Sequence, residues 1–154
     1  MIKILFLCHG NICRSPMAEY VMKDLVREAD MEDRFFIASA ATSAEELGNP
    51  VYPPAKRMLR AHGISCDGKT ARRMTRADYN EYDLLIGMDH ANIRNMTRIA
   101  GGDPENKIHL LLDYAGRHEE VADPWYTGDF QATWDDVAEG CAALLETLIS
   151  DGAK

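Results

Sequence analysis

Two residues near the N-terminus have side chains suited to phosphoryl chemistry. Cys8 and Arg14 are separated by five residues in the segment Cys8-His9-Gly10-Asn11-Ile12-Cys13-Arg14. A cysteine thiolate is a strong nucleophile, and the planar guanidinium of an arginine can hold two oxygens of a phosphoryl group. The pair therefore predicts that Cys8 attacks a phosphorus atom held by Arg14.

The residues around this segment predict a strand, a tight loop and a helix. Ile2–Leu7 is a continuous apolar run, typical of a strand buried on both faces. Ser15-Pro16 suits a helix start, with the serine as N-cap, and Gly10 and Asn11 tolerate the positive φ angles that a tight loop requires. Backbone N–H groups and the helix dipole would then surround a bound anion. The same groups would stabilise a thiolate of Cys8 at the floor of the loop.

The two-residue pattern by itself is weak, because it fixes only two positions. A cysteine at the end of a strand is usually a small buried hydrophobic residue. The complete string is more restrictive, since strand, cysteine, glycine, asparagine, arginine, serine and proline occur in the order that a phosphate-binding loop needs. This order favours phosphoryl chemistry over simple packing.

Strand-like and helix-like segments alternate along the rest of the chain. Three more short apolar segments predict buried strands at Phe35–Ala38, Leu84–Met88 and Ile108–Leu112. Apolar periodicity and helix stop signals predict helices from Ser15-Pro16 onward and over Pro54–His62, Asp89–Ile99 and Phe130–Leu148. We expect a single α/β domain over residues 1–154, with a four-stranded parallel sheet, helices on both faces and the phosphate-binding loop after the first strand. Ligands of such sheets bind beyond the carboxyl ends of the strands.

The overall composition excludes several classes of protein. The 154 residues include 17 basic and 25 acidic side chains, for a net charge of −8, which argues against a nucleic-acid partner. No apolar run reaches the about 18 residues of a membrane-spanning helix, and the apolar N-terminal stretch is too short for a signal peptide. We expect a cytoplasmic protein with four reduced cysteines and no membrane partner. No cysteine or histidine spacing indicates a metal site, and no cofactor is expected.

Four segments of the chain resemble the low-molecular-weight protein tyrosine phosphatases, and the resemblance spans nearly the whole length. The phosphate-binding loop is the most specific match. The segments are Leu7–Glu19, Ser39–Ser43, Met88–Asn92 and Asp123–Tyr126.

The resemblance implies a covalent mechanism. Cys8 would form a phosphocysteine, and Arg14 with the loop amides would bind the phosphoryl oxygens. Asp123 would protonate the leaving phenolate and then activate the attacking water, a role that a positioned acid can fill. An Asp-Pro pair by itself more often starts a turn, so this assignment depends on the resemblance. The implied partner is a phosphotyrosine-containing protein, the product is inorganic phosphate, and a monomer is expected.

The resemblance also implies supporting roles around the loop. Ser15 would donate to the sulfur of Cys8, and Asn11 and Ser39 would brace the loop by hydrogen bonds. Cys13 would form a reversible disulfide with Cys8 that protects the nucleophile from over-oxidation, although an inert packed thiol is the alternative. Trp125 and Tyr126 would wall the cleft and stack on the phosphotyrosine ring, with core packing as their alternative. His9, Gly10 and Ile12 complete the loop.

The chain departs from the family pattern at three positions. Glu45 stands where an aromatic residue commonly forms the opposite cleft wall, and its carboxylate would disfavour an acidic peptide. Ala41 replaces a glycine. Lys69 replaces a histidine that braces the loop asparagine, so we expect that bond to be altered.

Several rival functions share parts of the pattern. Protein arginine phosphatases typically carry threonine where this loop has Ile12, and the apolar side chain fits an aromatic substrate better. Thioredoxin-coupled arsenate reductases need a further cysteine pair downstream, and residues 80–100 contain no cysteine. A non-catalytic phosphate-binding module would not need Cys8 and Asp123. A dithiol redox protein that uses Cys8 and Cys13 would leave Arg14 unexplained.

Overall fold

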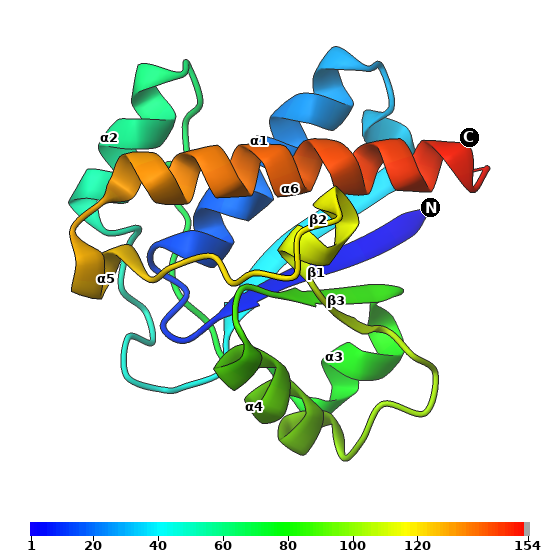
Figure 1. Ribbon diagram of the computed structural model, residues 1–154. Coiled ribbons are helices and arrows are strands. Elements are labelled where there is room, and N and C mark those ends of the chain that lie inside the picture. Colours follow the sequence, from blue (N-terminus) through cyan, green and yellow to red (C-terminus); the bar gives the residue numbers. More distant parts are fainter. Residues whose placement is uncertain (153–154) are drawn as a thin grey trace.

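The computed structural model describes residues 1–152 and confirms a four-stranded parallel sheet with helices on both faces (Figure 1). The strand order is β2-β1-β3-β4. The strands are β1 (Ile2–Cys8), β2 (Phe35–Ala41), β3 (Leu84–Gly87) and β4 (Ile108–Leu110). The helices are α1 (Arg14–Glu28), α2 (Pro53–Ala61), α3 (Arg76–Glu81), α4 (His90–Ala100), α5 (Pro124–Thr127) and α6 (Phe130–Ser150). Two short 3₁₀ helices, η1 (Glu32–Arg34) and η2 (Leu111–Ala115), follow α1 and β4.

Strand β1 lies inside the sheet and pairs with β2 on one side and β3 on the other. Its residues alternate between two apolar layers, as side chains do along a strand. Ile4 and Phe6 are fully buried in the layer formed with α1, α2 and α6. Leu5 and Leu7 are fully buried in the layer formed with α3 and α4. Burial on both faces explains why this strand reads as a continuous apolar run.

The two faces of the sheet carry different helices. Figure 1 shows α1, α2 and α6 on one side and α3 and α4 on the other. The long helix α6 buries Trp134, Val137, Cys141 and Leu144 in the first of these layers. The predicted apolar stripe of this helix is therefore confirmed as its core-facing side.

Several element boundaries differ from the sequence prediction. Helix α1 begins at Arg14, so Cys13 holds the N-cap position and Ser15 lies in the first helical turn; the prediction of a Ser15 N-cap is wrong. Strand β4 ends at Leu110, because its partner there is Gly87, the last residue of β3. The chain then turns at Leu111 into a 3₁₀ helix.

Two short helices carried no periodic signal in the sequence. Helix α3 has six residues and begins with a capping box between Thr75 and Asp78. Helix α5 has four residues after Asp123. Helices this short present too few apolar positions for a periodic pattern.

The four parallel strands point their carboxyl ends toward one edge of the sheet. At this edge, Thr42 N–H donates to the carbonyl of Cys8 (2.9 Å), which ties the segment after β2 to the end of β1. No helix within residues 1–152 is long and apolar enough to cross a membrane.

Candidate active site

The loop between β1 and α1 has the tight conformation that its sequence predicts, with one difference. Asn11 adopts a left-handed conformation with φ 60°, whereas Gly10 does not have a positive φ; for Gly10 that expectation is wrong. Glycine is instead favoured there by a close approach. A Cβ at this position would lie 3.2 Å from Cγ of Glu46, which is tighter than ordinary van der Waals contact.

Hydrogen-bonding groups converge on the sulfur of Cys8. The residue as a whole is only 3% exposed. Its Sγ accepts from the backbone N–H of Asn11 (3.3 Å) and from that of Ser15 (3.4 Å). The hydroxyl of Ser15 lies 2.9 Å from the same sulfur. Donors that point at one atom stabilise negative charge on it, so this loop can hold a thiolate.

The side chain of Asn11 connects two serine hydroxyls near Cys8 by hydrogen bonds. Its Nδ2 donates to Oγ of Ser15 (2.8 Å) and to Oγ of Ser39 (2.9 Å), and its Oδ1 accepts from the N–H of Arg72 (3.3 Å). Ser39 donates its own proton to the carboxylate of Glu19 (2.5 Å). Ser15 accepts from Asn11, and its hydroxyl proton has two acceptors within reach, the sulfur of Cys8 (2.9 Å) and the carbonyl of Ala40 (3.5 Å).

The ammonium of Lys69 hydrogen-bonds to Ser39, which in turn accepts from Asn11. Its Nζ donates to the carbonyl of Ser39 (3.0 Å) and lies 3.6 Å from the carboxylate of Glu19. Burial lowers the pKa of Lys69, and the nearby Glu19 charge opposes that shift. Glu19 is 4% exposed and also pairs with Lys23 (2.6 Å). Sequence reasoning missed Glu19 as a supporting residue.

Arg14 is 2% exposed and is held from three sides. Its NH1 donates to the carboxylate of Asp89 (2.8 Å) and to the carbonyl of Val121 (2.9 Å), while its NH2 lies 3.5 Å from Oδ2 of Asp123. Burial alone would lower the pKa of Arg14, but negative charge at Cys8 and the hydrogen bond to Asp89 outweigh it and raise the pKa. The guanidinium is therefore both charged and fixed in orientation.

Asp89 was not among the predicted site residues. It caps α4, where its Oδ1 accepts from the N–H of Asn92 (2.7 Å), and its other oxygen binds Arg14. The available signal was its position just after the third strand, because polar residues at the carboxyl ends of parallel strands meet at one edge.

Asp123 lies at the N-cap of α5 and faces Arg14. Its Oδ1 accepts from the N–H of Trp125 (3.1 Å). The preceding segment is tied down by a backbone bond from Val121 to Met88 (2.9 Å) and by Arg117, whose guanidinium binds Asp136 on α6 (2.8 Å). The segment before Asp123 is therefore tied to Met88, the residue that follows β3, and to α6.

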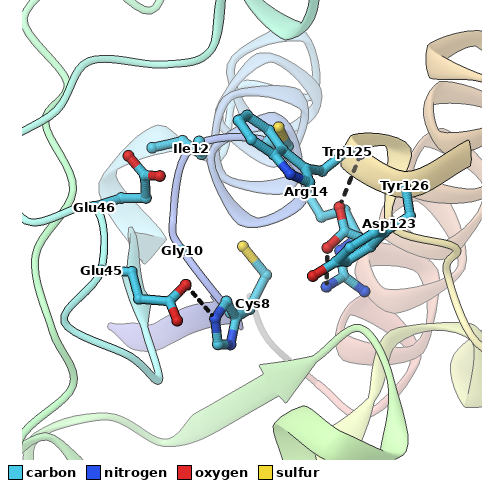
Figure 2. A pocket seen from close by; sticks show the side chains of 11 residues that line it. Cys8, Gly10, Ile12, Arg14, Glu45, Glu46, Asp123, Trp125 and Tyr126 are labelled. Atoms are coloured by element: carbon cyan, nitrogen blue, oxygen red, sulfur yellow. Dashed lines mark hydrogen bonds and ion pairs between the residues drawn. The ribbon is translucent and has the colours of Figure 1, made fainter. Parts of the chain in front are cut away.

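The sulfur of Cys8 lies in a cleft with two unlike sides (Figure 2). Trp125 and Tyr126 stand on one side with 53% and 82% of their surfaces exposed, and Tyr52 supports Trp125 with ring centroids 4.9 Å apart. Glu45 and Glu46 stand on the other side. The full lining is Cys8, His9, Gly10, Ile12, Cys13, Arg14, Glu45, Glu46, Asp123, Trp125 and Tyr126.

Cys13 lines the same cleft but differs from Cys8 in its electrostatic setting. Burial, followed by negative charge at Cys8 and at Asp123, raises the pKa of Cys13 to about 12. Its thiol is therefore protonated at neutral pH. Cys66 and Cys141 are buried free thiols that do not line the cleft, and burial raises their pKa values as well.

No group of three or more His, Cys, Asp or Glu side chains within residues 1–152 is arranged to hold a metal ion. Among the residues that line the cleft, Arg14 carries a buried guanidinium.

A parallel α/β sheet whose first strand ends in a cysteine–arginine loop defines a phosphate-binding scaffold. The family model described as low molecular weight phosphotyrosine protein phosphatase matches residues 3–154. The chain therefore belongs to the low molecular weight protein-tyrosine-phosphatase family, whose members are enzymes. The resemblance inferred from the sequence is confirmed.

Individual relatives cover the chain almost completely. The chain is 38% identical over 150 residues to the low molecular weight protein-tyrosine-phosphatase YfkJ of Bacillus subtilis, covering 96% of each. The crystal structure of YfkJ matches with a TM-score of 0.94, covering 99% of this chain and 97% of that one. The low molecular weight phosphotyrosine protein phosphatase of Gallus gallus is 36% identical over 148 residues, covering 93% of each. The structure of a drosophila arginine phosphatase matches at 29% identity with a TM-score of 0.89, covering 97% of this chain and 99% of that one.

Proposed function

We propose that this enzyme hydrolyses phosphotyrosine in proteins through a phosphocysteine on Cys8. The observation that carries the proposal is the convergence on one sulfur of the Asn11 and Ser15 amides and the Ser15 hydroxyl. Arg14 and Asp123 line the cleft around that sulfur. A nucleophile, a phosphate-binding cation and a proton donor are what phosphoester cleavage requires.

In the first step, the sulfur of Cys8 attacks phosphorus while Arg14 and the loop amides bind the phosphoryl oxygens. The bond to the tyrosine oxygen breaks, and the carboxyl group of Asp123 protonates that oxygen. The hydroxyl of Ser15, oriented by Asn11, stabilises the sulfur as nucleophile and later as leaving group.

In the second step, the Asp123 carboxylate accepts a proton from water as the water attacks the phosphocysteine. The phosphorus–sulfur bond breaks, and inorganic phosphate leaves. The Cys8 thiolate then returns to its amide donors, which are in place before the reaction and need no rearrangement.

The walls of the cleft support an aromatic substrate. Trp125 and Tyr126 offer ring surfaces on one side, and the apolar Ile12 also lines the cleft. The similarity to an arginine phosphatase keeps phosphoarginine as a second candidate. Parallel assays on phosphotyrosine and phosphoarginine peptides separate the two, and faster turnover of phosphoarginine would overturn the tyrosine assignment.

The direct test of the mechanism is Cys8→Ser. We expect no measurable turnover of p-nitrophenyl phosphate by this variant, because a serine hydroxyl is a far weaker nucleophile than a thiolate. Phosphate or vanadate should still bind, since Arg14 and the loop amides remain. Substantial residual turnover would contradict the assignment of Cys8 as nucleophile.

A nucleophilic thiol needs a reducing compartment, so we propose that the enzyme acts in the cytoplasm. All four cysteines are free thiols in the structure.

We also propose that the enzyme acts as a monomer, since one chain supplies all the groups in the mechanism. A mass of about 17 kDa by light scattering would agree with this proposal. An obligate dimer would contradict it.

A further inference from the structure

Two carboxylates stand on the rim of the cleft opposite the aromatic side. Glu45 and Glu46 belong to the segment that joins β2 to α2, and Figure 2 shows them across the cleft from Trp125 and Tyr126. A ring that enters the cleft toward Cys8 passes between these two sides. The peptide on either side of that ring must then cross the rim within reach of the glutamates.

These two carboxylates differ from the other acidic groups of the site because, within the described residues, neither pairs with a lysine or an arginine. Asp89 and Asp123 both pair with Arg14. Glu45 instead accepts from Nε2 of His9 (2.8 Å), and Glu46 accepts from the neutral side-chain amide of Asn49 (2.5 Å). Within residues 1–152, no lysine or arginine lies within 4.0 Å of either carboxylate.

The backbone of this segment is fixed, so the carboxylates are held at the rim before any substrate arrives. Ser43 donates to the carbonyl of His9 through its N–H (3.0 Å) and its hydroxyl (2.9 Å). Further along, Gly48 N–H donates to Ala71 O (2.9 Å), and Ala71 N–H donates to Asn49 O (2.9 Å). Charges fixed in this way contribute to specificity at a small ordering cost.

We propose that Glu45 and Glu46 are specificity-determining residues that select phosphotyrosine sites with a lysine or arginine next to the phosphotyrosine. This inference rests on the proposed function and names its substrate class. A basic neighbour gains two carboxylates as partners, whereas an acidic neighbour meets two like charges. Exposed charge pairs are individually weak, so we expect about a 3- to 10-fold preference in kcat/KM for lysine-flanked over glutamate-flanked peptides. We expect the two peptides to differ in KM and not in kcat, because the contact with the residue beside the phosphotyrosine is the same in the ground state and the transition state.

The test measures kcat/KM on two phosphotyrosine peptides that differ only in lysine or glutamate at the positions before and after the phosphotyrosine. The readout is the ratio of the two values, since effects on the chemical step cancel in a ratio. The variants are Glu45→Gln, Glu46→Gln and the double variant. Glutamine keeps an acceptor for His9 or Asn49 and removes only the charge. Glu146→Gln, at an exposed position on α6 outside the cleft, is the matched control.

We expect the ratio to fall toward 1 in the double variant, to stay at the wild-type value in the control and to shrink at high salt. A double variant that keeps the wild-type ratio, or a wild-type enzyme that prefers the glutamate peptide, would overturn this inference alone. Failure of the wild-type enzyme to hydrolyse both peptides and p-nitrophenyl phosphate would instead overturn the proposed function.

Discussion

At the residue scale, the site depends on a series of hydrogen bonds in which the donor and the acceptor of each contact follow from the contact before it. Glu19 can only accept, so Ser39 donates to it and accepts from Asn11. Asn11 also donates to Ser15, which leaves the hydroxyl proton of Ser15 for the sulfur of Cys8. The carbonyl of Ala40 is a second acceptor for the Ser15 hydroxyl at 3.5 Å, but the sulfur at 2.9 Å is the nearer one. A thiolate of Cys8 can only accept, so Ser15 would be the donor in that contact.

Asp123→Asn tests the proposed acid at this scale. Asparagine can still accept from Trp125 N–H, but it loses the charged contact with Arg14, and its amide cannot act as a general acid. We expect kcat/KM on phosphotyrosine peptides to fall about 10²–10⁴-fold, the usual contribution of a positioned acid. The loss on p-nitrophenyl phosphate should be smaller, because its leaving phenol needs less protonation. The basic limb of the pH–rate profile should flatten.

Asp129→Asn is the matched control for Asp123→Asn. Asp129 caps α6 by accepting from Ala132 N–H (2.9 Å) and does not line the cleft. Its substitution should lower stability slightly and leave the preference between substrates unchanged. Equal losses on both substrates in Asp123→Asn, with an unchanged pH profile, would show that Asp123 only shapes the loop.

Cys13→Ser tests the proposed redox protection. Peroxide would convert Cys8 to a sulfenic acid, and the thiol of Cys13 would displace water from it to form a disulfide. Burial is the largest cause of the raised pKa of Cys13 and persists after Cys8 is oxidised, so the thiolate fraction of Cys13 at neutral pH is small and grows with pH. Disulfide formation should therefore speed up as the pH rises.

In the Cys13→Ser variant, peroxide inactivation should become largely irreversible, because no second thiol intercepts the sulfenic acid. The measurement is the activity recovered with dithiothreitol after a fixed peroxide exposure. Recovery equal to that of the wild-type enzyme would show that Cys13 serves only as packing.

At the element scale, helix α6 approaches η2 at Gly140. A Cβ at this position would lie 2.5 Å from Cγ of Leu111, which is itself fully buried. Such a distance forces either the leucine or the helix to move. A glycine inside a long helix is unfavourable by helix propensity, so its presence here is explained by the close contact between the two elements.

Gly140→Ala separates these two effects. Helix propensity alone would stabilise the variant by about 1 kcal/mol, but overpacking against Leu111 should cost about 1–3 kcal/mol. We expect a lower melting temperature, by about 2–4 °C for each net kcal/mol lost. Ala142→Gly, at an exposed position of the same helix, gives the propensity effect alone. A Gly140→Ala variant more stable than wild type would show that Leu111 moves aside without cost.

At the scale of the whole molecule, the parallel sheet gathers distant segments at one edge. The Arg14–Asp89 pair joins residues 75 positions apart, and the Arg14–Asp123 pair joins residues 109 positions apart. The chain carries a net charge of −8, yet its cleft floor holds a buried guanidinium. The anion site is therefore a local arrangement within an acidic protein.

The sequence by itself determined the features that depend on neighbouring residues. The strand Ile2–Cys8, the loop after it and helix α1 follow one another directly, so apolar pattern, left-handed Asn11 and the position of Cys8 under a helix N-terminus could all be predicted. The fold class followed from strand–helix alternation, because parallel strands need helical crossovers on both faces.

Only the tertiary structure decided which distant groups meet. The binding of Asp89 to Arg14, the path from Lys69 and Glu19 to Ser39, and the place of Glu46 on the rim all depend on how separate segments pack. For Ser15, the residues around it suggested a helix cap, and only the family resemblance implied the contact with the sulfur of Cys8 that the structure shows. The reason is physical: a local pattern fixes backbone conformation, but a side-chain partner depends on burial, which forces each polar group to find whatever donor or acceptor the fold brings near it.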